Sequence, residues 1–387
     1  MEILAPAGST DALIAGVRCG ANAVYLGMKN INARRNAANF GTEELASAVK
    51  YCHERNVKVY VTLNILVSDE ELETAVHTAE EAINAGADGF IVQDLGLAKI
   101  LHEQFPKVRL HASTQCSVNS PEGFKALEEA GFVRAVIPRE MSLEEIKEIR
   151  KATDMELELF VHGALCMSVS GQCYMSAMLG GRSGNRGLCA QPCRLPFSAD
   201  ESKSCDLSLK DLSLLSHLKE IEEAGVCSLK IEGRMKSEYY LATVINAYRR
   251  AMDDYYKNGV VYKNNILYTE ELEKTAHREF TTAYLCGEND RTENFDDSQS
   301  SGTHKFIATV IEGNKDGYVL IEMRNRFKSG DELEILSPSE SFNKKITVKK
   351  MTDENGNEID DAKLVQQKIR LYTDIPLCKG DFLRKKI

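Results

Sequence analysis

The stretch that decides the fold is GANAVYL, residues 20–26, because the same pattern returns three more times along the chain. The later copies are GADGFIV at 86–92, GFVRAVI at 131–137 and GVCSLKI at 225–231. In each copy a glycine suits the left-handed position that ends a helix, and a short apolar run typical of a strand follows. The sequence therefore predicts a repeated helix–strand unit.

Extending this unit along the chain predicts eight strands with helices between them. The strands are expected near 2–5, 23–27, 58–63, 89–93, 109–113, 134–138, 156–162 and 228–232, with helical patterns at 43–55, 69–85, 121–130 and 142–152. Eight such strands in about 250 residues are typical of a β/α barrel. A doubly wound open sheet is the alternative, but it usually has fewer strands, and no G-x-G-x-x-G follows the first strand here. We predict an α/β fold, a TIM-like (β/α)8 barrel.

The chain divides into two predicted domains. Residues 1–286 form the barrel, with a cysteine-rich insertion at 163–206 and trailing helices after the last strand. Residues 287–304 are polar and are typical of a linker. From 305 to 387, alternating stretches separated by turns such as GNKDG predict a small all-β domain, a β-barrel or a sandwich.

Composition and charge restrict the class of protein. The 387 residues are 43% hydrophobic and 27% charged, which excludes global disorder. No apolar run reaches the ~18–20 residues that cross a bilayer. The opening residues MEILAPAGSTDAL lack the basic start of a signal peptide, so we expect a cytoplasmic protein with no membrane partner. The net charge of −10 argues against nucleic-acid binding by the whole surface, although residues 305–387 carry 16 Lys and Arg against 14 Asp and Glu.

Strand alternation predicts which side chains point into the barrel. Glu158, Phe160 and His162 would face inward from one strand, and Lys230 and Glu232 from another. Two interpretations stay open: a buried ion-pair layer of Glu158 with Lys230, or a polar substrate site at the C-terminal strand ends, where barrel enzymes act. His162, Glu158 and Glu232 are the candidates for catalysis. Further residues near the strand ends, which we expect to bind substrate, are Asn64, Gln93, Gln115 and Arg234.

Four of the eleven cysteines lie close together in sequence and indicate a metal site. Cys166, Cys173, Cys189 and Cys193 follow the spacing C-x6-C-x15-C-x3-C, directly after the seventh predicted strand. An odd number of cysteines without an export signal argues against a disulfide framework. Zinc prefers two tight pairs, whereas an iron–sulfur cluster accepts irregular spacing. Spacing favours the cluster and leaves zinc, or no metal, open.

The same segment is unusually poor in acids. Residues 159–199 contain no Asp or Glu, while Arg182, Arg186 and Arg194 are present. Such a segment either avoids acids because its thiolates are already negative, or forms an electropositive lip for an anion or an RNA backbone. Arg34 and Arg35, in an acid-free loop after the second strand, suit a carboxylate or a phosphate. We therefore add Arg34, Arg35, Arg186 and Arg194 to the expected substrate-binding residues.

Several of these stretches together resemble a known family. They are ELFVHGALC at 158–166, GQCYMS at 171–176, NRGLCAQPCR at 185–194 and KIEGRMKS at 230–237, with APAG at 5–8, NAR at 32–34 and RNRFKSGD at 324–331. This sequence resembles the collagenase-like peptidase family U32 over most of its length. The segment 305–387 is similar to the small β-domain that is often appended in that family.

The resemblance implies a chemistry that the family name does not describe. Better-understood members carry a 4Fe–4S cluster on four cysteines, which correspond here to Cys166, Cys173, Cys189 and Cys193. Some hydroxylate a wobble uridine in tRNA with prephenate as a required metabolite, one hydroxylates a cytidine in ribosomal RNA, and others act on the ubiquinone ring. The length, the appended domain and the C-x3-C pair resemble the tRNA uridine hydroxylase branch. Whether a paralogous partner chain is required stays open.

Three functions therefore compete at this point. The first is an iron–sulfur-dependent RNA hydroxylase, in which Arg34 and Arg35 would hold a dicarboxylate such as prephenate. The second is a peptidase, for which we find no G-x-S-x-G and no H-E-x-x-H, although a pair of His162 with Cys166 stays open. The third is a non-catalytic RNA-binding scaffold with a structural cluster. The hydroxylase uses most of the features above.

Overall fold

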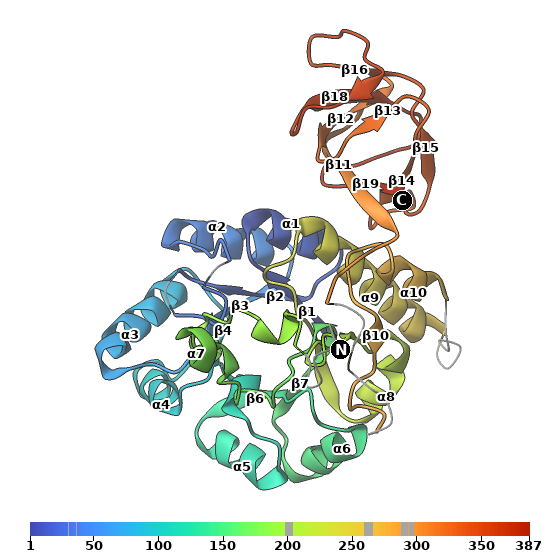
Figure 1. Ribbon diagram of the computed structural model, residues 1–387. Helices are drawn as coiled ribbons and strands as arrows, with labels where there is room; N and C mark the ends of the chain where they lie inside the picture. Colours follow the sequence, from blue (N-terminus) through green and yellow to red (C-terminus); the bar gives the residue numbers. More distant parts are fainter. Residues whose placement is uncertain (30, 36, 198–203, 259–265, 288–292, 294–297) are drawn as a thin grey trace.

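The computed structural model describes residues 1–29, 31–35, 37–197, 204–258, 266–287, 293 and 298–387. Eight parallel strands form a closed barrel (Figure 1). They are β1 (Glu2–Ala7), β2 (Ala23–Gly27), β3 (Lys58–Leu63), β4 (Gly89–Val92), β5 (Leu110–Ala112), β6 (Phe132–Ile137), β7 (Glu156–Ala164) and β9 (Val226–Ile231). The barrel closes because β9 pairs with both β7 and β1. The predicted TIM-like barrel is confirmed, and the alternative of a doubly wound open sheet is excluded.

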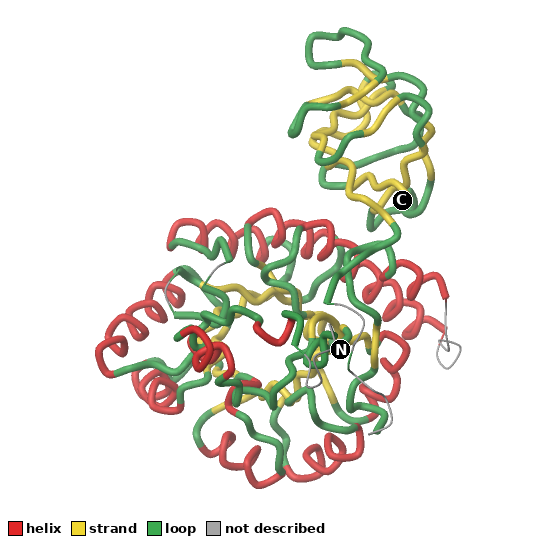
Figure 2. The backbone as a smooth tube through the Cα atoms, viewed as in Figure 1, coloured by secondary structure: helices red, strands yellow, loops and turns green. Residues whose placement is uncertain are grey.

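A ring of helices covers the outside of the barrel, as Figure 2 shows in red around the yellow strands. The helices are α1 (Thr10–Arg18), α2 (Thr42–His53), α3 (Asp69–Asn84), α4 (Leu95–Gln104), α5 (Pro121–Glu129), α6 (Leu143–Ala152), α8 (Leu218–Glu223) and α9 (Glu238–Asn258). Side-chain caps begin several of them; Ser9, Ser120 and Ser142 each accept a hydrogen bond from the first turn. In the described ranges, no helix has both the length and the apolar character that a membrane span requires.

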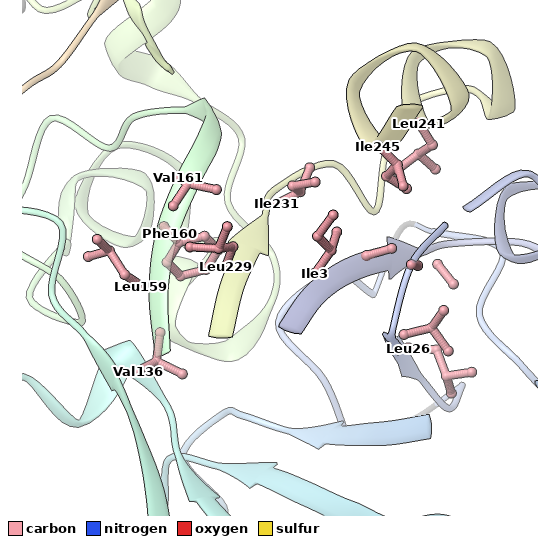
Figure 3. Close-up of a cluster of buried hydrophobic side chains, with 14 of the residues drawn as sticks. Ile3, Leu26, Val136, Leu159, Phe160, Val161, Leu229, Ile231, Leu241 and Ile245 are labelled. Atoms are coloured by element: carbon pink, nitrogen blue, oxygen red, sulfur yellow. The ribbon is translucent and has the colours of Figure 1, made fainter. Parts of the chain in front are cut away.

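The apolar core lies between the strands and the helices. Ile3, Leu26 and Leu159 point outward from their strands and are fully or almost fully buried. Leu241 and Ile245 of α9 belong to the same cluster and face the barrel (Figure 3). The outward positions are thus apolar, as strand alternation predicts, which leaves the inward positions free for polar side chains.

Charged side chains occupy the lower barrel interior, the part towards the N-terminal ends of the strands. Glu158 accepts bonds from Lys230 Nζ at 2.6 Å and from Arg134 Nη1 at 3.1 Å. Arg134 also pairs with Glu2 at 2.6 Å and with Glu156 at 2.7 Å. The expected buried pair of Glu158 with Lys230 is therefore present, within a larger network in which the charges are paired.

Two short strands were not predicted. β8 (Asp211–Ser213) pairs antiparallel with the end of β7, and β10 (Phe280–Thr281) pairs with β8. Strands of two or three residues carry too little periodicity to be recognised in a sequence. Between β7 and β8 runs the cysteine-rich segment, which contains α7 (Met175–Gly180). The trailing helices are α9 and α10 (Ile266–Leu272).

The C-terminal domain is all-β, as expected. Its strands are β11 (His304–Lys315), β12 (Tyr318–Met323), β13 (Phe327–Lys328), β14 (Glu332–Leu336), β15 (Lys345–Thr347), β16 (Met351–Thr352), β17 (Asp361–Ala362), β18 (Lys368–Tyr372) and β19 (Phe382–Lys386). Seven of them form an antiparallel sheet, over a separate core that includes Ile321, Leu333 and Leu371. Half of the predicted linker 287–304, namely 288–292 and 294–297, lies outside the described residues.

A buried ion pair joins this domain to the barrel domain. Arg384 of β19 donates to both carboxylate oxygens of Glu271 in α10, at 2.6 and 2.8 Å. Both side chains are fully buried, and Lys274 adds a bond of 2.8 Å to Glu334. Phe306 stacks on Tyr239 of α9, with ring centroids 5.2 Å apart. The small domain is therefore fastened to α9 and α10, at the side of the barrel (Figure 1).

We expect Arg384→Met to destabilise the protein by about 3–5 kcal/mol, because it removes the bidentate partner of the buried Glu271 carboxylate. Urea unfolding followed by circular dichroism measures the change. Arg326→Met is the matched control, because it removes an exposed arginine that pairs with Asp361 at 2.6 Å within the same domain. Equal unfolding midpoints for the two variants would show that the junction does not depend on this pair.

Candidate active site

A pocket opens at the C-terminal ends of the barrel strands. These ends meet at one edge of the barrel, so each βα connection contributes side chains to the same place. The pocket is lined by Tyr25, Ala33, Arg34, Thr62, Asn64, Ile91, Ser113, Thr114, Gln115, Val136, Arg139, Phe160, Lys230, Glu232 and Arg234. The composition is mixed, with apolar walls and several polar groups, as is usual for a small-molecule site.

Positive charge is in excess in this pocket. Its lining contains four cations, Arg34, Arg139, Lys230 and Arg234, and one carboxylate, Glu232. Arg34 Nη2 lies 3.0 Å from Glu232 Oε1, and Arg139 Nη2 lies 4.0 Å from Glu232 Oε2. Arg234 donates to Thr62 Oγ1 at 2.9 Å. Glu232 cannot neutralise all the guanidinium groups, so the pocket favours an anionic ligand.

Aromatic rings form the apolar part of the site. The Arg139 guanidinium lies 3.7 Å from the centroid of the Phe160 ring, and Lys230 Nζ lies 4.6 Å from that of Tyr25. The Tyr25 hydroxyl donates to the Ile231 carbonyl at 2.8 Å, which fixes the ring. The cations are thus held against ring faces, an arrangement that stabilises positive charge away from water.

Two pKa shifts describe the electrostatics of the pocket. Burial raises the pKa of Glu232, but Arg34, Arg139 and Arg234 outweigh burial and lower it to about 2. Burial and the neighbouring charge of Arg34 lower the pKa of Arg234 to about 10. Glu232 is therefore ionised at neutral pH and acts as a fixed counter-charge, while the cations around it repel one another.

Five of the expected site residues lie in the pocket, namely Arg34, Asn64, Gln115, Glu232 and Arg234. Asn64 accepts a bond from the Ala33 amide at 3.1 Å and so holds the loop that carries Arg34. Sequence reasoning missed Arg139. Its position just after a strand could have identified it. Arg139 lies two residues after the end of β6, much as Asn64 lies directly after the end of β3.

The prediction that His162 faces the barrel interior is wrong. The β7–β9 register shifts between Phe160 and His162, so two residues on β7 match one step on β9. Such a bulge breaks the alternation and turns the side chain outward. The His162 ring packs between Tyr248 and Phe280, with centroids 5.7 and 5.4 Å away. Burial lowers its pKa to about 3, with contributions from nearby cationic groups.

The other expected residues lie outside the pocket lining. Glu158 is buried in the charge layer beneath the pocket. Gln93 donates to the Gln115 carbonyl at 3.2 Å and supports that loop. Arg35 lies 3.8 Å from Glu71. Arg186 Nη2 donates to both oxygens of the same Glu71 carboxylate, at 2.6 and 2.7 Å. Substrate contact by Glu158, Gln93 and Arg186 stays a prediction, whereas Arg35 faces Glu71 outside the pocket lining.

Arg194 ties the two ends of the cysteine-rich segment together. Its guanidinium donates to the Leu165 carbonyl at 2.7 Å and to the Leu209 carbonyl at 2.6 Å. Leu165 immediately precedes the first clustered cysteine, and Leu209 lies just before β8. Arg194 therefore closes the base of this segment, and its role in substrate binding stays a prediction.

The cysteine-rich segment lies across the mouth of the barrel. The amide and hydroxyl groups of Ser170 both donate to the carboxylate of Glu140, which lies in the loop after β6, at 2.9 Å. Arg186 donates at 2.9 Å to the carbonyl of Leu66, which lies in the loop after β3. Gly171 packs tightly against the loop after β5, where an added Cβ would lie 2.4 Å from the Gln115 carbonyl oxygen. Contacts with several βα loops therefore fix the segment over the pocket.

The four clustered cysteines are all free thiols. Cys166 and Cys189 are exposed, and Cys173 and Cys193 are partly buried. Burial raises the pKa values of Cys173 and Cys193, and the neighbouring clustered thiols raise them further. The Gln191 amide donates to Cys189 Sγ at 3.3 Å, a bond that stabilises a thiolate. Among the described residues, no three His, Cys, Asp or Glu side chains are already grouped to hold a metal ion.

Comparison with known proteins places this architecture in a family. Residues 8–294 match the profile of peptidase family U32, and residues 302–384 match the profile of the peptidase family U32 C-terminal domain. The chain belongs to peptidase family U32. The resemblance seen in the sequence motifs is confirmed, and the two matched regions agree with the barrel and the all-β domain.

Curated relatives of this U32 protein carry two kinds of name. The tRNA hydroxylation protein P1 of Bacillus subtilis (strain 168) is 35% identical over 402 residues, covering 99% of this chain and 94% of the relative. A 23S rRNA 5-hydroxycytidine synthase of Escherichia coli (strain K12) is 35% identical, covering 92% of this chain and 55% of the relative. A collagenase of Porphyromonas gingivalis is 32% identical, covering 74% of each.

We expect Glu232→Gln to lower the free energy of unfolding by about 3 kcal/mol at pH 7. The folded pKa of about 2 lies below the ordinary value of 4.5. The carboxylate therefore contributes its full stability above pH 4.5 and loses it as the pH falls towards 2. Urea unfolding at pH 7 and pH 3 should show a smaller difference from the wild type at pH 3. Glu148→Gln, on the exposed face of α6, is the control, and a pH-independent difference for Glu232→Gln would contradict this electrostatic origin.

Proposed function

We propose that this protein is an iron–sulfur-dependent RNA nucleobase hydroxylase, most specifically one that 5-hydroxylates a wobble uridine in tRNA with prephenate as co-substrate. One observation carries the proposal: a cationic pocket at the barrel mouth lies beneath a segment with four free cysteines, in a U32 chain. The names of the Bacillus and Escherichia relatives support RNA as the substrate. Such an enzyme would act in the cytoplasm, where tRNA is.

The donor set fits an iron–sulfur cluster. Four thiols come from one segment that contains no Asp or Glu, and thiolate is the ligand that such clusters take. Cys189 already accepts a backbone N–H, a type of contact that tunes clusters. Cys166, Cys173, Cys189 and Cys193 would hold the cluster, and the thiols would draw together on binding it. When bound, a cluster supplies electron transfer or activates an oxygen donor.

The pocket residues would bind and orient the small co-substrate. Arg34 and Arg139 flank Glu232 and would take the carboxylates of a dicarboxylate, relieving the excess of positive charge. Phe160 and Tyr25 would pack on the ring of prephenate. Glu232 would keep Arg34 in place while the co-substrate is bound. Thr114 Oγ1 and Gln115 Oε1 are buried without a hydrogen-bond partner among the described residues, which a polar ligand would correct.

The base itself would enter from the mouth of the barrel. A wobble uridine lies in the single-stranded anticodon loop, so little unpairing is needed to present it. Gly187, two residues before Cys189, packs against the loop that carries Arg34, where an added Cβ would lie 2.4 Å from the Asn32 carbonyl oxygen. The co-substrate pocket and the cysteines are therefore neighbours, as a reaction shared between them requires.

The peptidase alternative loses its candidate dyad. His162 lies between aromatic rings with a pKa near 3, so it is not a base poised to activate the Cys166 thiol at neutral pH. The collagenase name of one relative keeps this activity worth assaying beside hydroxylation. The scaffold alternative separates from the enzyme by activity, and any need for a paralogous partner chain would appear as activity restored by cell extract.

We expect the wild-type protein, purified without oxygen, to contain about four iron and four sulfide per chain and Cys189→Ala to contain almost none. Hydroxylated uridine, measured by nucleoside mass spectrometry of tRNA from a deletion strain carrying each variant, should disappear with the cluster. The control is Cys378→Ala, an exposed cysteine of the C-terminal domain. Zinc alone in the wild type would contradict the cluster, and hydroxylation that persists in Cys189→Ala would contradict its role.

We expect Arg34→Ala and Arg139→Ala each to raise the prephenate concentration for half-maximal hydroxylation by about tenfold, because each removes a charge-assisted contact worth about 1.4 kcal/mol. Arg35→Ala is the matched control, since Arg35 faces Glu71 outside the pocket. Circular dichroism confirms that the variants fold. An Arg35→Ala effect as large as those of the pocket variants would contradict the assignment.

A further inference from the structure

The outer side of the cysteine-rich segment presents apolar side chains to solvent. Tyr174, Met178 and Leu179 are 58%, 84% and 70% exposed. Tyr174 and Met178 are four residues apart around the short helix α7, so they project on the same side. Apolar residues grouped at such exposure are unusual unless a partner covers them. We call these three residues with Arg182 the α7 surface.

This surface has a fixed orientation over the barrel mouth. Ser176, on the inner side of α7, is buried, and its hydroxyl accepts a bond from the Ala190 amide at 2.9 Å. Arg182, just after the helix, donates a bond of 3.2 Å to the Leu188 carbonyl. The segment is held down by the contacts of Ser170 and Arg186 with the barrel loops. α7 therefore lies in front of the barrel opening (Figure 1), and its apolar side chains Met178 and Leu179 are exposed to solvent.

Charge distinguishes this surface from the rest of the molecule. Residues 159–199 carry three arginines and no acid, whereas the whole chain has a net charge of −10. A polyanion is therefore attracted to this region more than to the rest of the barrel domain, which carries the excess of acids. Exposed aromatic and aliphatic side chains beside cations are also the combination on which unpaired bases pack, because every base has an apolar face.

We propose that the α7 surface is a docking site for single-stranded RNA next to the target base. Bases that flank the target pack on Tyr174, Met178 and Leu179, and their phosphates lie near Arg182. This inference rests on the proposed function, and it adds the place where the RNA loop is held. RNA fits better than a second copy of the chain, because two chains of charge −10 repel each other and a protein partner over α7 would obstruct the mouth.

The test uses the double variant Met178→Ser/Leu179→Ser of the full-length, cluster-containing protein. Both side chains are so exposed that their removal leaves the packing of the segment intact. The matched control is Leu364→Ser/Val365→Ser, which removes two apolar side chains of 67% and 77% exposure from the C-terminal domain. Binding of a fluorescent anticodon stem-loop RNA is measured by anisotropy at several salt concentrations, with mass spectrometry of hydroxylated uridine and light scattering for mass.

We expect the α7 variant to bind the RNA about tenfold more weakly than the wild type, and the control less than twofold. The dependence of affinity on salt should stay the same, because the lost contacts are apolar and release no counterions. Hydroxylation should fall with binding, while iron content stays at the wild-type level.

Three results would overturn the inference, and they are distinguishable. Equal RNA affinity of the α7 variant and the wild type, with hydroxylation intact in both, removes the docking site and leaves the proposed function standing. Unchanged RNA affinity with the loss of a wild-type dimer would make the α7 surface a protein interface. A wild-type holoprotein that neither binds nor hydroxylates RNA would refute the proposed function and the docking site together.

Discussion

The ion pair of Glu158 with Lys230 in the barrel interior is the interaction on which the site depends. A barrel of eight parallel strands encloses its inward side chains, so a charge placed there must find a partner within the barrel. Glu158 lies 2.6 Å from Lys230 Nζ, and Arg134 forms ion pairs with both Glu158 and Glu2. The charges of the lower layer are therefore paired. One layer higher, Arg34, Arg139 and Arg234 face the single carboxylate of Glu232. The surplus of positive charge at the strand ends is what makes the upper layer a place for an anion.

Strand β7 connects the parts of the proposed enzyme. It contributes Glu158 to the charge layer and Phe160 to the pocket, and it leads directly to Cys166. The bulge after Phe160 turns His162 away from the interior, into an aromatic cluster with Tyr248 and Phe280. Beyond Leu159, where its pairing with β6 ends, β7 pairs with β8, and the cysteine-rich segment between β7 and β8 lies over the mouth. A small shift in strand register thus separates a structural histidine from the chemistry above it.

The proposed function differs from the reaction in the family name. A hydrolase needs an activated nucleophile or a metal with an open coordination position. The described part of the chain instead offers four clustered free thiols, a cationic pocket with aromatic walls and an apolar surface at the mouth. The proposed hydroxylation, a redox reaction on a bound base with a small organic anion beside it, would use all of these features. The C-terminal domain, held by Arg384 on Glu271, adds a second surface in a constant position relative to the barrel.

The sequence by itself determined the barrel, its strand positions and the two-domain division, because helix-ending glycines and apolar periodicity are local properties of the chain. It also identified the four cysteines and the acid-free segment, and it placed Arg34, Asn64, Gln115, Glu232 and Arg234 at the strand ends. Only the tertiary structure decided which of the candidates share one pocket. Arg139 enters it, His162 leaves it through a register shift, and Arg35 and Arg186 turn to Glu71, since each outcome depends on residues distant in sequence. Local pattern states which side of a strand a residue takes, whereas packing between elements decides what that residue meets.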